Sequence, residues 1–191
     1  MEEVEKGRLK PRIFINQQSR SRQWIPPEAG TIRVDVDASV LENGQAACGG
    51  MIMDDQGRWI TGFKKCLGVL PVVATELVAI HIGLEACKSF QLPNVQLCSG
   101  SMEAINMISR DSGANHPLYN EIERVKHLLH DGQNVQVNYS IREAIQCADI
   151  LAKAGHPVGP QTVLVTGIDP TCRRRFMEDF QGLRRTKDPP N

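Results

Sequence analysis

The sequence predicts an α/β protein with one domain built on a mixed β-sheet. The spacing of the apolar residues changes from alternation to helical periodicity near Pro71, and the segments on either side have the lengths of strands and helices. Three short strands before this point imply an antiparallel meander. The later strands alternate with helices, which implies parallel strands joined by crossovers. The predicted order is β β β α β α α β α, with helices covering the sheet.

The first three strands follow from alternation and turn residues. In TIRVDVDASV (31–40), one face carries Ile32, Val34 and Val36, and the other carries Arg33, Asp35 and Asp37. The segments AACGGMIM (46–53) and RWITGFKKC (58–66) have strand-like composition, and DDQGR between them predicts a tight connection.

Helical spacing begins at Pro71, which suits a first helical turn, and continues through Leu77 and Leu84 to Phe90. A strand is predicted at VQLC (95–98), followed by a helix over 101–110. The loop DSGANHP leads to a helix over about 118–130. The strand NVQVNYS and a helix that ends near Gly155 complete the domain, and Ser140 and Glu143 have capping-box spacing at the start of that helix.

Composition narrows the functional classes. The chain has 191 residues and 41% hydrophobic content, which is enough for one core. It contains no apolar run of about 18 residues and its first residues are charged, so we expect no membrane insertion and an intracellular location, nuclear or cytoplasmic. The six cysteines lack zinc-site spacing and are interpreted as buried free thiols.

Charge is divided along the chain although its net value is zero. Residues 1–30 carry +2, residues 31–170 carry −5 and residues 171–191 carry +3. A net negative charge over residues 31–170 does not fit a protein that binds nucleic acid by charge alone. Bound divalent cations would make the local charge more positive.

We predict three segments: a polar lead over 1–29 that is a linker or disordered, the domain over 30–156, and a tail over 157–191 with a short amphipathic helix. Phe176 and Phe180 have i, i+4 spacing in this helix. Packing on the core is the main interpretation of the helix. Contact with a partner, contact with phosphate and a nuclear signal are the alternatives.

Several blocks in order resemble a ribonuclease H-like domain. The blocks are AGTIRVDVDAS, CGGMIMDDQGRWITGF, ATELVAIHIGLEAC, the strand at 95–98 with its helix, HPLYNEIERVKHLL and IREAIQCADILAKAG. They look like the reverse-transcriptase-derived type of retroelements, abundant in plant genomes, and the resemblance extends from about Trp24 to about Leu183. It implies a five-stranded sheet, three strands antiparallel and two parallel, with helices on both faces.

The resemblance also implies an activity, which is hydrolysis of RNA in RNA/DNA hybrids by two Mg²⁺ ions held by carboxylates. Two such ions, roughly 4 Å apart, stabilise the attacking and leaving oxygens together. The family's acidic positions fall on Asp37, Glu76 and Asp149. The structural alternatives are a solvated strand-end carboxylate for Asp37, a helix-dipole contact for Glu76 and a solvated helix face for Asp149. Ala38 stands where the family usually has glycine, and strain would follow if the backbone needed a positive φ there.

The family's third carboxylate, at the end of the fourth strand, is matched here by Gly100 in CSGS. Tyr139 and Ile145 likewise replace the family's His and Asn. Asp35 is disfavoured as a replacement for the missing third carboxylate, because it lies two residues before Asp37 and two residues along a strand span about 6.6 Å. Ser99, Gly100 and Ser101 precede a helix and are a candidate anion-binding nest, with simple capping by Ser101 as the alternative.

Two functions are therefore predicted. The favoured one is a catalytically impaired domain that binds nucleic acid, an RNA/DNA hybrid or RNA, or acts as an interaction module with an unknown protein partner. The alternative is an active Mg²⁺-dependent endonuclease that uses Asp37, Glu76 and Asp149.

Overall fold

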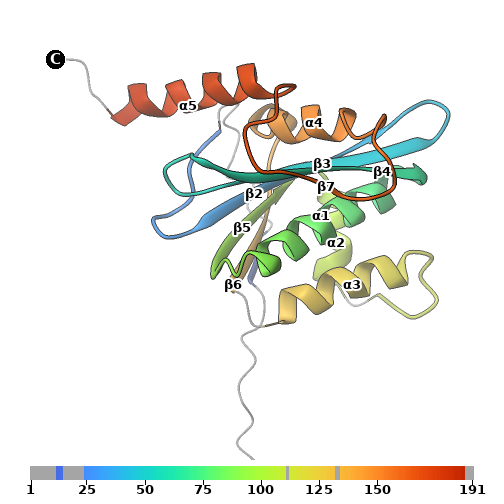
Figure 1. Cartoon of the computed structure of the whole chain (residues 1–191). Helices are drawn as coiled ribbons and strands as arrows, with labels where there is room; N and C mark the ends of the chain where they lie inside the picture. Colours follow the sequence, from blue (N-terminus) through green and yellow to red (C-terminus); the bar gives the residue numbers. More distant parts are fainter. Residues whose placement is uncertain (1–11, 15–23, 111, 132–133, 188–191) are drawn as a thin grey trace, which may run out of the picture.

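The fold is a seven-stranded mixed sheet with helices on both faces (Figure 1). The computed structural model describes residues 12–14, 24–110, 112–131 and 134–187. The strands are β1 (Arg12–Phe14), β2 (Ile32–Val40), β3 (Gln45–Met53), β4 (Trp59–Val69), β5 (Asn94–Ser99), β6 (Asn134–Tyr139) and β7 (Val163–Val165). Their spatial order is β1-β6-β5-β2-β3-β4-β7.

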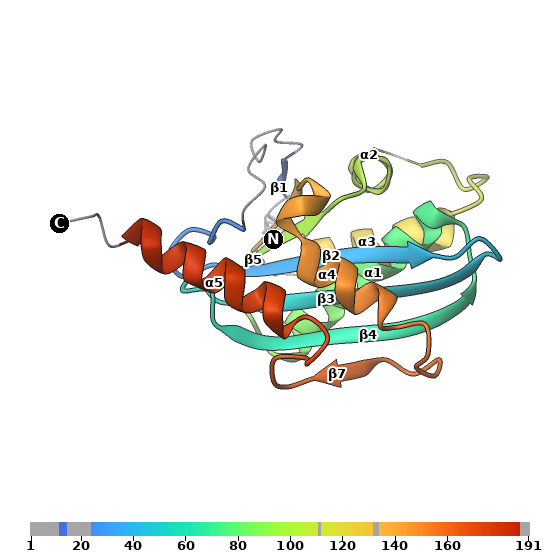
Figure 2. The ribbon, with the colours of Figure 1, turned by 90° about the horizontal axis from the view of Figure 1, so that it is seen from above.

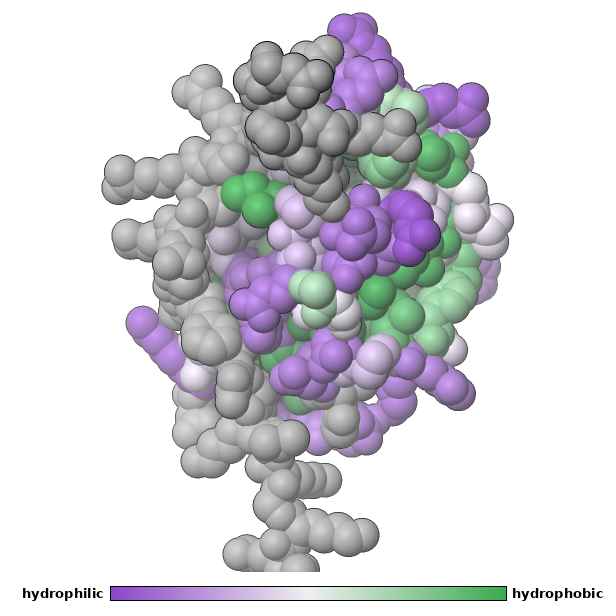
Figure 3. All heavy atoms as spheres, turned by 90° about the vertical axis from the view of Figure 1, so that its left-hand side faces the viewer, coloured by the Kyte–Doolittle hydropathy of each residue, from purple (hydrophilic) through white to green (hydrophobic). Residues whose placement is uncertain are grey.

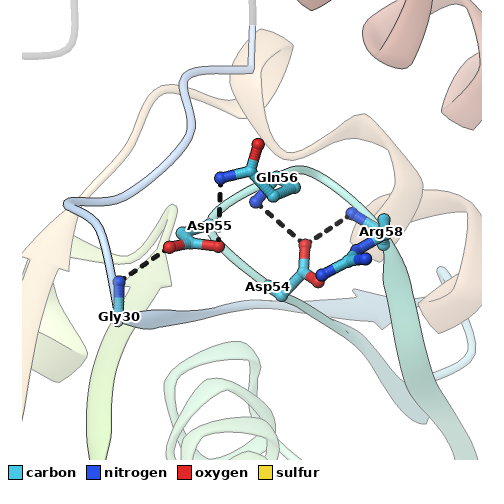
Figure 4. A network of polar contacts seen from close by, with 5 residues as sticks. All are labelled: Gly30, Asp54, Asp55, Gln56 and Arg58. Atoms are coloured by element: carbon cyan, nitrogen blue, oxygen red, sulfur yellow. Dashed lines mark hydrogen bonds and ion pairs between the residues drawn. The ribbon is translucent and has the colours of Figure 1, made fainter.

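Strands β2, β3 and β4 form the predicted antiparallel meander, and β5 and β6 add to β2 in parallel. The β3–β4 turn is fixed by Asp54, whose Oδ1 accepts hydrogen bonds from the backbone N–H groups of Gln56 and Arg58 (Figure 4). Asp55 accepts a 2.7 Å hydrogen bond from the backbone N–H of Gly30. The turn is thereby tied to the segment that leads into β2.

Helices α1 (Val72–Ser89), α2 (Met102–Ser109) and α3 (Tyr119–His130) lie below the sheet in Figure 1, and α4 (Gln146–Lys153) and α5 (Arg173–Lys187) lie above it. Figure 2 shows α4 and α5 crossing the meander strands. Each face of the sheet therefore has its own helical cover. Within the described ranges, no helix is long and apolar enough to cross a membrane.

Besides a small group made of Cys98, Ile145 and Ala148, the described residues form two hydrophobic clusters. The larger one joins α1, α2 and α3 to the sheet and includes Val34, Leu77 and Leu97, all fully buried. The smaller one, which we call the tail cluster, lies on the other face and consists of Trp24, Met51, Met53, Cys147, Leu151, Cys172 and Phe176. Phe176 packs edge-on against Trp59, with ring centroids 5.6 Å apart. The tail helix thus packs on the core, as its amphipathic spacing predicts.

At the end of the molecule where α5 ends, both hydrophilic and hydrophobic residues reach the surface (Figure 3).

The cysteines are free thiols, and five of the six are buried, in agreement with their apolar sequence contexts.

The structure differs from the sequence prediction at the edges of the sheet and before α4. The five expected strands are β2 to β6, and β1 and β7 extend the sheet to seven. β1 lies in the lead for which the sequence predicts no regular structure, and most of that lead falls outside the described residues. The predicted capping box at Ser140 and Glu143 is wrong, because a short 3-10 helix (Arg142–Ala144) comes first and α4 begins at Gln146.

Candidate acidic site

The sheet register places Asp37 beside Gly100. In the parallel pair of β2 and β5, Val36 lies opposite Ser99, so the next residues along the two strands are Asp37 and Gly100. The two positions share the carboxyl-terminal edge of parallel strands, where open α/β sheets place their sites. A carboxylate at position 100 would therefore lie next to Asp37.

Gly49 brings Asp149 to the same edge. Gly49 lies opposite Asp37 on β3, and a Cβ there would lie 2.3 Å from the backbone nitrogen of Ala152. Only a residue without a side chain allows α4 to approach the sheet so closely. The close approach sets Asp149, in the first turn of α4, near enough for its charge to act on Asp37.

Glu76 approaches from α1 and is only 2% exposed, so it belongs to the buried stripe of the helix and not to its solvated face. Asp37 is likewise 1% exposed. Among the described residues, both carboxylate oxygens of Asp37 and Oε2 of Glu76 are buried without a hydrogen-bond partner. Buried oxygens without partners are costly unless they are protonated or bind a cation.

Burial accordingly raises the pKa of both acids. The pKa of Asp37 is raised to about 6, by burial first and then by the charge of Asp149. The pKa of Glu76 is raised to about 8, by burial and by the charge of Asp37. At neutral pH, without a bound cation, Asp37 is therefore mostly ionised whereas Glu76 keeps its proton.

Asp149 behaves differently because its carboxylate points to a cation of its own helix. Its Oδ2 accepts a 2.6 Å hydrogen bond from Lys153 Nζ, one turn later, and the Asp149 side chain is 29% exposed. Arg142 is a second nearby cation. The charges of Arg142 and Lys153 both lower the pKa of Asp37, and that of Arg142 also lowers the pKa of Glu76.

Asp35 is engaged in hydrogen bonds with Arg33 and Trp24. It is fully buried, accepts a 2.7 Å hydrogen bond from Arg33 Nε, and accepts a 3.0 Å hydrogen bond from the indole of Trp24. The Arg33 guanidinium also stacks over the Trp24 ring at 5.0 Å. This network is structural.

Ala38 lies in regular β2 and its φ is not positive. The strain that a positive φ would cause in an alanine at this position therefore does not arise.

The hydroxyl groups of the SGS turn bond within the turn and α2. Ser101 Oγ accepts a hydrogen bond from the backbone N–H of Ala104, which makes Ser101 the cap of α2. Ser99 Oγ accepts one from the backbone N–H of Ser101. Capping by Ser101, the simpler of the two predictions, is the role that these bonds support.

The acids present do not fit the two-ion arrangement that the family resemblance implies. In the part of the chain that the structure describes, no three His, Cys, Asp or Glu side chains are grouped closely enough to hold a metal ion. Asp37 and Glu76 have oxygens available for a cation, Asp149 is paired with Lys153, and Gly100 contributes no donor.

The sequence assigns no role to two cations near Asp37, Arg142 and Lys153, or to the pair of Ser39 and His156. Arg142 is part of a block that carries the family resemblance. Lys153 follows Asp149 at i, i+4, a spacing that predicts an ion pair on a helix. Ser39, two residues after Asp37, lies 2.9 Å from His156 Nε2 through its Oγ. No local pattern joins Ser39 to His156, because 117 residues separate them.

Comparison with known proteins places this arrangement in a family. Residues 34–155 match the family described as reverse transcriptase-like. The chain belongs to this family. The matched range contains Asp37, Glu76, Gly100 and Asp149, and it leaves out β1, β7 and α5.

A curated relative of this reverse transcriptase-like chain is the "Putative ribonuclease H protein" of Arabidopsis thaliana. It is 27% identical over 147 residues, which make up 76% of this chain and 23% of the relative. This chain thus spans about a quarter of that protein's length.

Solved structures confirm the predicted ribonuclease H-like fold. The RNase H1 of Halobacterium salinarum matches with a TM-score of 0.60 and 22% identity, covering 65% of this chain and 96% of that one. LC11-RNase H1, solved in complex with an RNA/DNA hybrid, matches with a TM-score of 0.60 and 20% identity, again over 65% and 96%. At such identities the likeness concerns the fold.

Proposed function

We propose that this chain is a retroelement-derived ribonuclease H-like module that binds nucleic acid, an RNA/DNA hybrid or RNA, and that has lost most of its hydrolytic activity. The observation that carries the proposal is Gly100, which lies beside Asp37 at the end of β5, where the family resemblance places the third carboxylate. A nuclear or cytoplasmic location and a plant retrotransposon origin belong to the same proposal.

The expected loss of activity has a physical magnitude. Replacing even an outer partner of a metal ligand commonly lowers metal affinity or activity about 10-fold to 100-fold, and a directly coordinating carboxylate is worth at least that much. The remaining acids are also poor Mg²⁺ ligands at pH 7, because Glu76 has a pKa of about 8 and Asp149 is paired with Lys153. Both effects act against a two-ion site.

Nucleic-acid binding is proposed on the fold and on one structural neighbour. LC11-RNase H1 was solved with an RNA/DNA hybrid, and its fold covers 65% of this chain. A protein can keep the shape that receives a hybrid after it loses a metal ligand, because the frame is made by the apolar core.

Restoring the acid tests the proposal. Gly100 has no positive φ, and a Cβ there would lie 3.4 Å from Ile145 Cδ1 and 3.5 Å from Arg142 Cγ, which are ordinary contacts. Gly100→Asp should therefore fold. Its matched control is Gly113→Asp, the same change at a loop position with no atom within 4 Å of the added Cβ.

Cleavage of a labelled RNA/DNA hybrid is measured with Mg²⁺ or Mn²⁺ for the native chain, both aspartate variants and Asp37→Asn, and calorimetry reports Mg²⁺ binding. We expect the native chain to match Asp37→Asn, and Gly100→Asp to gain cation binding and cleavage that Gly113→Asp does not gain. Cleavage by the native chain that Asp37→Asn abolishes would establish the alternative function, an active Mg²⁺-dependent ribonuclease.

A further inference from the structure

Arg142 is an exposed cation at the acidic edge. It is the first residue of the 3-10 helix that follows β6. Among the described residues, no hydrogen bond or ion pair involves its guanidinium, in contrast to Lys153, which is bound to Asp149. The Arg142 guanidinium therefore keeps its donors for a ligand.

The side chain of Arg142 lies next to Gly100. The Cγ of Arg142 is 3.5 Å from the position of a Cβ on Gly100, so the aliphatic stem passes beside this glycine. An aspartate at position 100 would bring a carboxylate next to the stem and within reach of the guanidinium. With glycine, no acid at that position competes for the guanidinium.

Cations as well as acids surround the site. The charges of Arg142 and Lys153 both act on Asp37, and Lys153 is bound to Asp149. A phosphate that approaches this edge therefore meets positive charge next to the carboxylates. A site with four ionised carboxylates would repel it unless metal ions were bound.

We propose that Arg142 binds a phosphate of the nucleic-acid backbone, and that this contact needs no divalent cation. The planar guanidinium has the geometry for two parallel hydrogen bonds to phosphate oxygens. Arg142 is exposed, lies beside Gly100 and has a guanidinium without an ion-pair partner among the described residues, so the contact is assigned to Arg142. This inference rests on the proposed function, because it assigns the mode by which that site holds nucleic acid.

The test measures binding of the full chain to a fluorescent RNA/DNA hybrid in EDTA by anisotropy, over a series of KCl concentrations. Arg142→Gln is compared with Arg124→Gln, which removes the same charge from an exposed position on α3. Gly100→Asp is the third variant. Circular dichroism verifies that each variant is folded.

We expect the native chain to bind in EDTA and Arg142→Gln to bind about tenfold more weakly, the loss typical of one charge-assisted contact. The slope of log K against log[KCl] should fall by about 1 for Arg142→Gln and stay unchanged for Arg124→Gln. Gly100→Asp should weaken binding in EDTA in a similar way, because its carboxylate pairs with Arg142.

Equal losses for Arg142→Gln and Arg124→Gln would overturn the inference, since overall charge would then explain both. Unchanged binding by Arg142→Gln, or by Gly100→Asp, would also overturn it, and these results leave the proposed function intact. No binding by the native chain at any salt concentration would overturn the proposed function and the inference together.

Discussion

Replacing Glu76 with glutamine should make the protein more stable at high pH and alter it little at low pH. Glu76 is buried on α1 with a pKa of about 8, against 4.5 for an ordinary glutamate. In the unfolded chain the carboxyl loses its proton near pH 4.5, whereas in the folded chain it keeps the proton until about pH 8. The folded state therefore binds more protons in this window, and the free energy of unfolding falls as pH rises through it.

The size of the effect follows from the two pKa values. Each pKa unit corresponds to about 1.4 kcal/mol, so Glu76 lowers the free energy of unfolding by up to about 5 kcal/mol between pH 4.5 and pH 8. Asp37, whose pKa moves from 3.8 to about 6, adds up to about 3 kcal/mol over a lower window. Together these upper limits approach the whole stability of a typical domain, about 5–15 kcal/mol.

The assay is urea unfolding at pH 5, 6, 7, 8 and 9 with EDTA present, followed by tryptophan fluorescence. The native chain should lose stability steadily from pH 5 to pH 9, and Glu76→Gln should retain several kcal/mol more at pH 9 than the native chain does. Glu42→Gln, at an exposed position between β2 and β3, should follow the native curve. Parallel pH curves for the native chain and Glu76→Gln would refute the reasoning.

Three further changes test the packing that positions the site, each by urea unfolding. Gly49→Ala should cost at least about 3 kcal/mol, because its Cβ would lie 2.3 Å from the Ala152 backbone nitrogen of α4, whereas Gly159→Ala, in open space, should change stability by less than about 0.5 kcal/mol. Asp35→Ala should cost about 3–5 kcal/mol because it leaves the buried Arg33 without its carboxylate, and Glu178→Ala, which breaks an exposed pair with Arg174, should cost at most about 1 kcal/mol. Phe176→Ala should cost about 3–5 kcal/mol through the tail cluster, and a loss as small as that of Met177→Ala, at a side chain 40% exposed, would contradict the packing of α5 on the core.

The central fold can be predicted from the sequence because its signals are local. Alternation in β2 and helical spacing in α1 each lie within one segment, and the predicted helix over 118–130 matches α3 within a residue at its start. Strands β1 and β7 give no such signal. Each has three residues and is held by a neighbour far away in the sequence, β6 or β4.

The candidate site rests on the family resemblance, and its electrostatics cannot be predicted from the sequence. The family resemblance points to Asp37, Glu76 and Asp149, and the register explains why Gly100 lies next to Asp37. Burial of Asp37 cannot be read from alternation, because its strand face looks polar and becomes covered only when α4 packs at Gly49. The positions of Arg142 and Lys153 around the acids also depend on this packing.

The tail cluster has a practical consequence for anyone who would excise the family-matched part of this chain. The region shared with the reverse transcriptase-like family is residues 34–155, yet Trp24 lies before it and Cys172 and Phe176 lie after it. A protein trimmed to the shared region would expose Met51, Met53 and Leu151 to water on the side of the sheet that carries α4. The family boundaries therefore divide one hydrophobic cluster, so a fragment that keeps this cluster should begin before Trp24 and end after α5.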